Sequence, residues 1–179
     1  MTLYLFPRMR QVPLHVAHTY LYNLSCCLVL MRDTPLNEIT LRRYERPYAT
    51  SRRELVKKIC LSLGLLQPGD SRDVIVDVLL VLDEARKQKK ELSSVEVIDL
   101  ITELRKKHSL EAKGLAESNI RRQLKRLRDM MLVDKKQNVY RLSEFEPLSH
   151  IFSNKIENFL IPQTVERVKE YLHTFDKKG

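Results

Sequence analysis

The fold of this chain is decided by residues 116–142, which read AESNIRRQLKRLRDMMLVDKKQNVYRL. Within this stretch Ile120, Leu124, Leu127 and Met131 recur at steps of three or four residues. Such spacing places apolar side chains on one face of a helix, where they can pack on a hydrophobic core. We therefore expect an amphipathic helix over residues 117–131.

The polar side of this expected helix is strongly basic. Its basic positions are Arg121, Arg122, Lys125, Arg126 and Arg128. Ser118, or Glu117 just before it, can cap the helix start by accepting hydrogen bonds from the free N–H groups of the first turn. That cap places Asn119 and the first two arginines in the first exposed turn.

Two short runs follow the helix, at 131–134 and 139–142, and they are joined by Lys135, Lys136, Gln137 and Asn138. Short runs of this kind on either side of a polar turn predict a β-hairpin. We expect this hairpin to have a basic, polar tip.

A basic amphipathic helix followed by a basic hairpin resembles the recognition helix and wing of a winged helix-turn-helix domain. The resemblance covers residues 70–145 and is nearest to archaeal and bacterial transcription regulators of the PadR, ArsR and MarR kinds. It implies a mainly α fold, a winged helix-turn-helix with a small β-hairpin wing and additional N- and C-terminal helices. It also implies a regulator of transcription that binds double-stranded DNA. The helix at 117–131 would enter the major groove and the wing at 131–142 would contact the backbone.

Side-chain chemistry divides the expected DNA contacts into two groups. Base edges suit Asn119, Arg121, Arg122 and Lys125, while phosphates suit Lys113, Arg128, Lys135, Lys136 and Arg141. Ser118 and Arg126 are further DNA-binding candidates on the same helix.

The net charge of +9 is concentrated in two segments. Residues 113–143 hold nine Lys or Arg against three acidic residues, a net +6, and residues 40–58 hold seven against two, a net +5. Charge gathered in patches is typical of a surface for a polyanion, most often nucleic acid. The alternative is a solvated surface of mixed charge.

The linker at 40–51 contains Arg42, Arg43 and Arg46 interleaved with Tyr44 and Tyr48. These arginines could follow a phosphate backbone or enter a minor groove, as arms beside helix-turn-helix domains do. Equally, the tyrosines could pin the linker to the core.

Three further helices are expected before the basic one. Ser51 and Glu54 form a capping-box pattern for a helix whose face is Leu55, Ile59, Leu63 and Leu66, ended by Pro68 and Gly69. Asp70 or Ser71 caps a helix to residue 89, and its run at 74–82 is apolar nearly all round, as in a central buried element. Ser93 and Glu96 form a second capping box, opening a helix to residue 107 with Val95, Ile98, Ile101 and Leu104 or Arg105 in register. Between these two helices, Leu92 is a short extended segment of the kind that pairs with a wing.

The C-terminal part, 146–179, is predicted to form two helices separated by Pro162. The apolar face of the first is Phe145, Leu148, Ile151, Phe152, Ile156, Phe159 and Leu160, and that of the second is Val165, Val168, Leu172 and Phe175. In the regulators that this chain resembles, such helices form a homodimer. The alternative is that they pack back on residues 51–66.

Residues 1–39 differ from the rest, since no Asp, Glu, Lys or Arg occurs at 11–31. Steps of three and four residues suit packing on a partner helix, and they relate Leu14, Ala17, Leu21, Leu24, Leu28 and Met31. The alternatives are a membrane-inserted segment and a translation start at Met31. His15 and His18 with Cys26 and Cys27 could bind a metal, although buried thiols and helix-face histidines are the commoner explanation.

The remaining expectations concern chemistry and location. Four glycines, at 64, 69, 114 and 179, exclude a Gly-rich phosphate loop, and the five histidines stand outside known catalytic motifs. We predict no enzymatic activity, cofactor, metal, membrane association or small-molecule ligand. Three cysteines fit a reducing cytoplasm.

The alternatives to DNA-specific regulation are a protein-interaction module of a larger assembly and nonspecific nucleic-acid binding, with RNA as a further possibility.

Overall fold

The computed structural model describes residues 35–70, 73–111 and 113–178. The chain divides into two units, Met1–Glu38 and Ile39–Gly179. The predictions made for residues 11–31, which are the partner-helix seam, the membrane segment, the start at Met31 and the His and Cys metal site, lie outside the described residues. Within the described ranges, no helix is long and apolar enough to cross a membrane.

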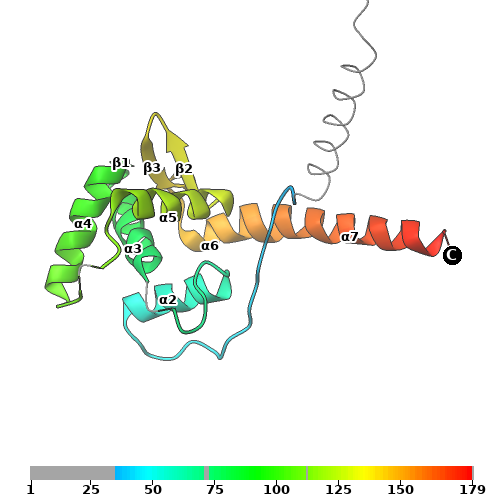
Figure 1. Ribbon diagram of the computed structural model, residues 1–179, viewed down its shortest axis with the longest axis horizontal. Helices are drawn as coiled ribbons and strands as arrows, with labels where there is room; N and C mark the ends of the chain where they lie inside the picture. The colour runs from blue at the N-terminus through cyan, green and yellow to red at the C-terminus, as the bar shows by residue number, and fades with distance from the viewer. Residues whose placement is uncertain (1–34, 71–72, 112, 179) are drawn as a thin grey trace, which may run out of the picture. The chain divides into compact units, whose positions relative to one another are not determined.

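The second unit is mainly helical and contains a small antiparallel sheet, as the sequence predicts (Figure 1). Its elements are α2 (Arg52–Ser62), α3 (Val74–Lys87), β1 (Leu92–Ser93), α4 (Ser94–Lys107), α5 (Glu117–Asp129), β2 (Val133–Lys136), β3 (Val139–Leu142), the 3-10 turn η1 (Ser143–Phe145), α6 (Leu148–Ile151), the π-helical η2 (Phe152–Leu160) and α7 (Ile161–Asp176). The strand order in the sheet is β1-β3-β2.

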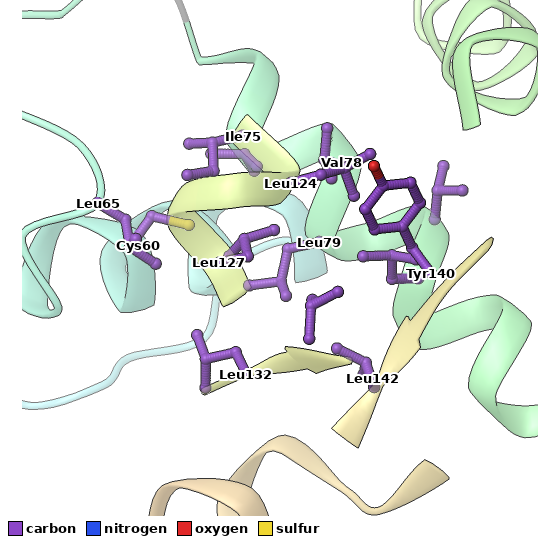
Figure 2. Close-up of a cluster of buried hydrophobic side chains, with 14 of the residues drawn as sticks. Cys60, Leu65, Ile75, Val78, Leu79, Leu124, Leu127, Leu132, Tyr140 and Leu142 are labelled. Atoms are coloured by element: carbon purple, nitrogen blue, oxygen red, sulfur yellow. The ribbon is translucent and has the colours of Figure 1, made fainter. Parts of the chain in front are cut away.

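Helix α3 is the central element, as its apolar run predicts. Val76, Val78 and Leu79 are fully buried. Figure 2 shows side chains from α2, α3, α5 and the hairpin meeting in this core. The predicted helix start was wrong, because α3 begins at Val74 with Asp73, not Asp70 or Ser71, at the cap position.

Helix α2 starts as predicted but presents a different face. The Ser51 hydroxyl accepts a hydrogen bond from the backbone N–H of Glu54 at 3.3 Å, which confirms Ser51 as the N-cap. Val56 and Cys60 are buried, whereas Leu55 and Ile59, predicted to face the core, are exposed. The helix ends at Ser62, earlier than Pro68, because Gly64 takes a positive φ of 68° and its N–H bonds the Leu61 carbonyl.

Helix α4 confirms the predicted capping box and C-terminal boundary. The Ser93 side chain accepts from the Glu96 backbone while the Glu96 carboxylate accepts from the Ser93 backbone. The predicted face was wrong at Val95, which is 56% exposed, and the buried apolar residues are Val97 and Ile101. Strand β1 pairs with β3, with Leu92 opposite Tyr140, as expected for this segment.

Helix α5 buries the predicted apolar face, with Ile120, Leu124 and Leu127 fully enclosed. Its N-cap is Ala116, and no side chain caps it, so the expectation that Ser118 or Glu117 caps the helix was wrong. The helix also ends at Asp129, before Met131, whose φ is +58°. A positive φ cannot continue a right-handed helix.

The hairpin exists, but its tip is shorter than predicted. Lys135 and Lys136 belong to β2, and only Gln137 and Asn138 form the turn. Both turn residues have positive φ values, 46° and 67°, which fit the twist of a two-residue hairpin.

Pro162 does not break the C-terminal helix. Helical structure runs without interruption through α6, η2 and α7, as the single rod in Figure 1 shows. The N–H of Ile161 bonds the carbonyl of Ile156, five residues back, so the wider π-helical turn ends just before the proline. Pro162 follows directly after this wider turn, at the second position of α7.

Candidate nucleic-acid interface

The solvent side of α5 carries cations that are free of intramolecular ion pairs. Arg122, Lys125 and Arg128 are exposed, and none lies within 4.0 Å of a carboxylate among the described residues. Ser118 is also exposed, in the first turn of the same helix. Arg121 differs, because its guanidinium pairs with Glu117 at 2.6 Å one turn earlier. An exposed pair of this kind contributes little to stability and can be exchanged for another anion.

Asn119 is turned towards its own backbone. Its amide nitrogen donates to the carbonyl of Gly114 at 2.7 Å, and its oxygen accepts from Arg122 at 2.9 Å and from Gln123 at 3.2 Å. Both ends of the Asn119 amide are therefore engaged within the chain.

Arg126 points inward from α5. Its guanidinium donates to the Gln123 side chain at 3.1 Å and to the Gly64 carbonyl at 3.5 Å. It also lies near Cys60, where burial raises the pKa of the thiol to about 12 and the Arg126 charge opposes that rise. Cys60 is therefore protonated at neutral pH. Arg126 itself is only partly exposed.

The cations of the hairpin differ in their exposure to solvent. Lys136 is exposed, and Lys135 lies over the Tyr140 ring with its Nζ 5.7 Å from the ring centroid. Arg141 is only partly exposed, because it pairs with Glu91 at 3.0 Å and lies 4.9 Å from the centroid of the Phe145 ring. Arg141 thus joins the hairpin to the segment before β1.

The basic linker is partly structural. Arg42 donates to the carbonyls of Leu61 and Leu66 at 3.2 and 3.1 Å and to the Gln67 side chain at 2.8 Å, so it binds the C-terminal end of α2. Arg43 and Arg46 are exposed.

Tyr44 lies against α2 and is not among the side chains of the hydrophobic core. The Tyr44 ring packs under Lys58, whose Nζ lies 5.3 Å from the ring centroid, and Lys58 also pairs with Glu45. Tyr48 is exposed. The side chain of Lys113, the remaining predicted contact, is exposed and pairs with Glu111.

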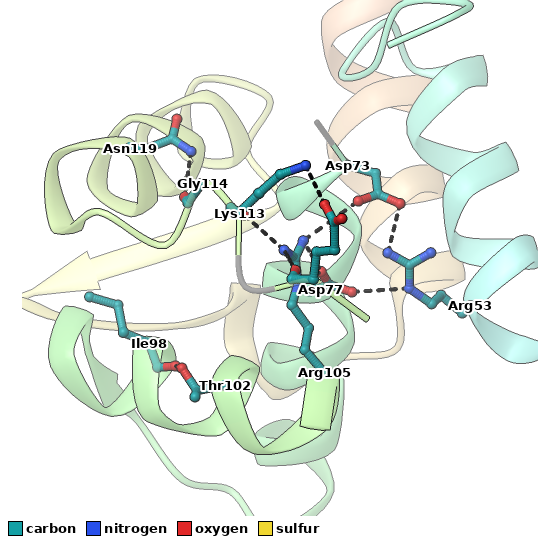
Figure 3. A network of polar contacts seen from close by, with 10 residues as sticks. Arg53, Asp73, Asp77, Ile98, Thr102, Arg105, Lys113, Gly114 and Asn119 are labelled. Carbon is teal, nitrogen blue, oxygen red and sulfur yellow. Dashed lines mark hydrogen bonds and ion pairs between the residues drawn. The ribbon is translucent and has the colours of Figure 1, made fainter. Parts of the chain in front are cut away.

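A buried charge network lies behind the start of α5, and the sequence did not reveal it (Figure 3). Asp77, fully buried within the apolar run of α3, accepts from Arg105 of α4 at 2.6 and 2.7 Å and from Arg53 of α2 at 3.1 Å. Arg53 also pairs with Asp73 at 2.7 Å. Although burial lowers the pKa of Arg53, the hydrogen bond to Asp73 and the charge of Asp77 raise it overall. Two cations thus neutralise two carboxylates at the junction of α2, α3 and α4.

An apolar cavity of about 670 Å³ lies elsewhere in the same unit. Its walls include Leu55 and Ile59 of α2, Leu148 and Phe152 of the C-terminal helix, and Tyr48 of the linker. The exposed side of α2 is therefore one wall of a hollow. No group of three or more potential metal ligands occurs in the part of the chain that the structure describes.

Comparison with family models, curated proteins and solved structures finds no match to this chain.

Proposed function

We propose that the protein is a transcription regulator that binds double-stranded DNA through α5 and the β2–β3 hairpin. The observation that carries this proposal is a group of exposed cations on α5 that form no ion pair with the described residues, namely Arg122, Lys125 and Arg128. Fixed positive charges on one helix attract a polyanion and release its counterions on binding.

The order of elements supports a winged helix-turn-helix as the framework of this binding. From α3 to β3 the order is helix, strand, two helices and two strands, with β1 paired to the hairpin. This is the order found in winged helices, which insert the second of the paired helices into the major groove. On this arrangement α5 is the recognition helix and the hairpin is the wing.

Contacts within the protein narrow the set of DNA-binding residues. Arg122 and Lys125 are placed to reach base edges, helped by Ser118 and by Arg121 once it leaves Glu117. The phosphate contacts are then Arg128, Lys135 and Lys136, with Arg43, Arg46 and Lys113 as outlying cations. Arg42, Asn119, Arg126 and Arg141 are not part of this set, because each is only partly exposed and its polar groups bond other protein groups.

We also propose a homodimer formed through α7. Ile161, Val165, Val168, Leu172 and Phe175 follow alternating steps of four and three residues, the spacing of a coiled-coil seam. No residue of α7 is buried within the chain. Lys169 and Asp176 flank this seam on one side, so two antiparallel copies can set the lysine of one against the aspartate of the other. A second copy of the chain therefore fits this face.

A pair of substitutions tests the proposed division of labour on DNA. Arg122→Ala is expected to relax the preference for one base pair of a selected site at a cost of about 1–3 kcal/mol. Lys136→Ala is expected to weaken binding to all sequences alike and to reduce the salt dependence. Selection of bound sequences from a random pool, followed by affinity measurements, distinguishes the two. Equal losses on all DNA from both variants would contradict the assignment.

A second candidate function, a protein-interaction module, is favoured by the apolar cavity beside α2. Its wall residues Leu55 and Ile59 are large and exposed, and clustered exposed apolar residues are typical of contact sites. A protein that binds wild type but not an Ile59→Glu variant would support this function. Unchanged binding of that protein by the variant would contradict it.

A further inference from the structure

The connection from α4 to α5, residues 108–116, is held in place mainly by polar contacts. Leu110 in this loop is 38% exposed, and Leu115 is only partly buried against the core. Ser109 and Gly114 take positive φ values of 51° and 80°, which interrupt regular structure. Hydrophobic burial alone therefore anchors this loop weakly, although it sets where α5 begins.

Arg105 joins the loop to the buried carboxylate of α3. Its Nε and Nη2 bond Asp77 at 2.7 and 2.6 Å, while its Nη1 donates to the carbonyls of Glu111 and Lys113, both at 2.8 Å (Figure 3). One planar guanidinium thus holds a carboxylate on one side and two loop carbonyls on the other. A lysine ammonium has three donors on one atom and cannot reproduce this geometry.

Asn119 continues the connection into the first turn of α5. Its amide donates to the carbonyl of Gly114, the residue after Lys113, and its oxygen accepts from the Arg122 guanidinium. Gly114 itself is tightly placed, since a Cβ there would lie 2.9 Å from the Val74 side chain of α3. Hydrogen bonds and adjacent peptides therefore lead from buried Asp77 to exposed Arg122.

We infer that Arg105 and Asn119 are positioning residues, which fix the loop at 108–116 and thereby the direction of the Arg122 side chain. This inference rests on the proposed function in that Arg122 is the residue that reads DNA. Buried ion pairs add little stability compared with apolar packing, so a network of this kind is better suited to fixing geometry than to strengthening the fold. The guanidinium of Arg122 starts from a defined position, which lowers the entropic cost of ordering it on a base.

Two variants test the inference. Arg105→Lys keeps the charge beside Asp77 but loses the two loop carbonyls, and Asn119→Ala removes the link to Gly114 and Arg122 without touching the buried network. Lys106→Ala, an exposed cation next to Arg105 on the same helix, is the matched control. The Asn119 variant remains informative if Arg105→Lys folds poorly, because Asn119 is not part of the core.

The first measurement is amide hydrogen exchange, which does not depend on DNA. Both variants are expected to exchange about tenfold faster in the loop at 109–116 and the first turn of α5, with α3 and the control unchanged. Unchanged exchange in the loop overturns the inference.

The second measurement is sequence preference against random duplex DNA over a salt series. Asn119→Ala is expected to lower the ratio of specific to nonspecific affinity about tenfold while the salt dependence stays at the wild-type value. A faster-exchanging loop with wild-type preference would overturn the role in directing Arg122. If wild type itself has no preference, the proposed function fails, and with it the role in directing Arg122. The exchange data then still decide whether Arg105 and Asn119 hold the loop.

Discussion

Helices α5 and α7 have similar amphipathic patterns but opposite surroundings. The apolar face of α5, formed by Ile120, Leu124 and Leu127, is completely buried. The apolar face of α7, formed by Val165, Val168, Leu172 and Phe175, is 47–76% exposed. Periodicity predicts that a helix has an apolar face, but it does not say what covers that face. The core covers the apolar face of α5, which leaves the basic side of that helix facing solvent. Among the described residues, nothing buries the apolar face of α7, and we propose that a second copy of the chain covers it.

The same leucine-to-alanine substitution in both helices tests whether their apolar faces differ in this way. Leu124→Ala removes a fully buried side chain beside α3 and is expected to lower the free energy of unfolding by about 2–5 kcal/mol. Leu172→Ala, at 57% exposure, is expected to change it by less than about 0.5 kcal/mol at concentrations where the protein is monomeric. Urea unfolding measures both. Equal losses would mean that α7 packs within the chain.

The proposed dimer gives the next largest effect. Leu172→Glu places a charge in the α7 seam and is expected to raise the dimer dissociation constant about a hundredfold or more. His173→Glu adds the same charge one residue away, outside the seam, and serves as the control. Sedimentation equilibrium provides the measurement. A wild-type chain that is monomeric at all concentrations would contradict the role given to α7.

Alanine substitutions at two glycines distinguish the energetic cost of backbone strain from the cost of a steric clash. Gly69 and Gly114 have similar positive φ values, 82° and 80°, but a Cβ at Gly69 meets nothing within 4 Å whereas one at Gly114 meets Val74. Gly69→Ala is expected to cost about 1 kcal/mol from the backbone alone, and Gly114→Ala about 2 kcal/mol. Thermal or urea unfolding measures the difference. Identical costs would show that the loop moves away from α3 at no expense.

The start of α4 gives a smaller, pH-dependent effect. Hydrogen bonds from the Ser93 backbone, from Lys90 and from the Ser93 hydroxyl lower the pKa of Glu96 from 4.5 to about 2. A lowered pKa stabilises the folded state fully above pH 4.5, and this contribution disappears as the pH falls through 2. Because the carboxylate is 44% exposed, solvent screening limits it to about 0.5 kcal/mol.

The Glu96→Gln variant tests this contribution, since glutamine keeps the shape of the cap and does not titrate. We expect its unfolding free energy to fall less than that of wild type between pH 4.5 and 2. Parallel pH profiles for the two proteins would contradict the assignment.

Local chemistry made much of the fold predictable from sequence. Ser51 and Ser93 cap helices because a hydroxyl can satisfy N–H groups only a few residues away, and the long apolar run of α3 has no stable position other than the interior. Features that depend on distant neighbours were missed. The inner face of α2 differs by one residue from the predicted face, because Val56 and Cys60 are buried while Leu55 and Ile59 border the cavity.

The candidate interface shows the same limit. Sequence identifies Arg42, Arg126 and Arg141 as cations, but each folds back on a carbonyl, a side-chain amide or a carboxylate that is distant in the chain or lies on an adjacent turn. Composition cannot distinguish these arginines from Arg122, which is exposed on α5 whereas the other three are only partly exposed. The ion pair of Arg105 and Asp77 joins residues that are 28 positions apart in the sequence. The sequence indicates this pair only through Asp77, a single carboxylate within an apolar run.

We propose that the exposed cations of α5 and the hairpin bind DNA, and the dependence of DNA affinity on salt concentration tests this proposal. The affinity of the purified protein for random duplex DNA and for a selected site would be measured from low to high salt. With three phosphate contacts from α5 and the hairpin, Arg128, Lys135 and Lys136, the logarithm of affinity is expected to fall with the logarithm of salt at a slope of about −3 per chain. Lys136→Ala should make the slope shallower by about 1. Weak binding that does not change with salt, in wild type and variant alike, would contradict the claim.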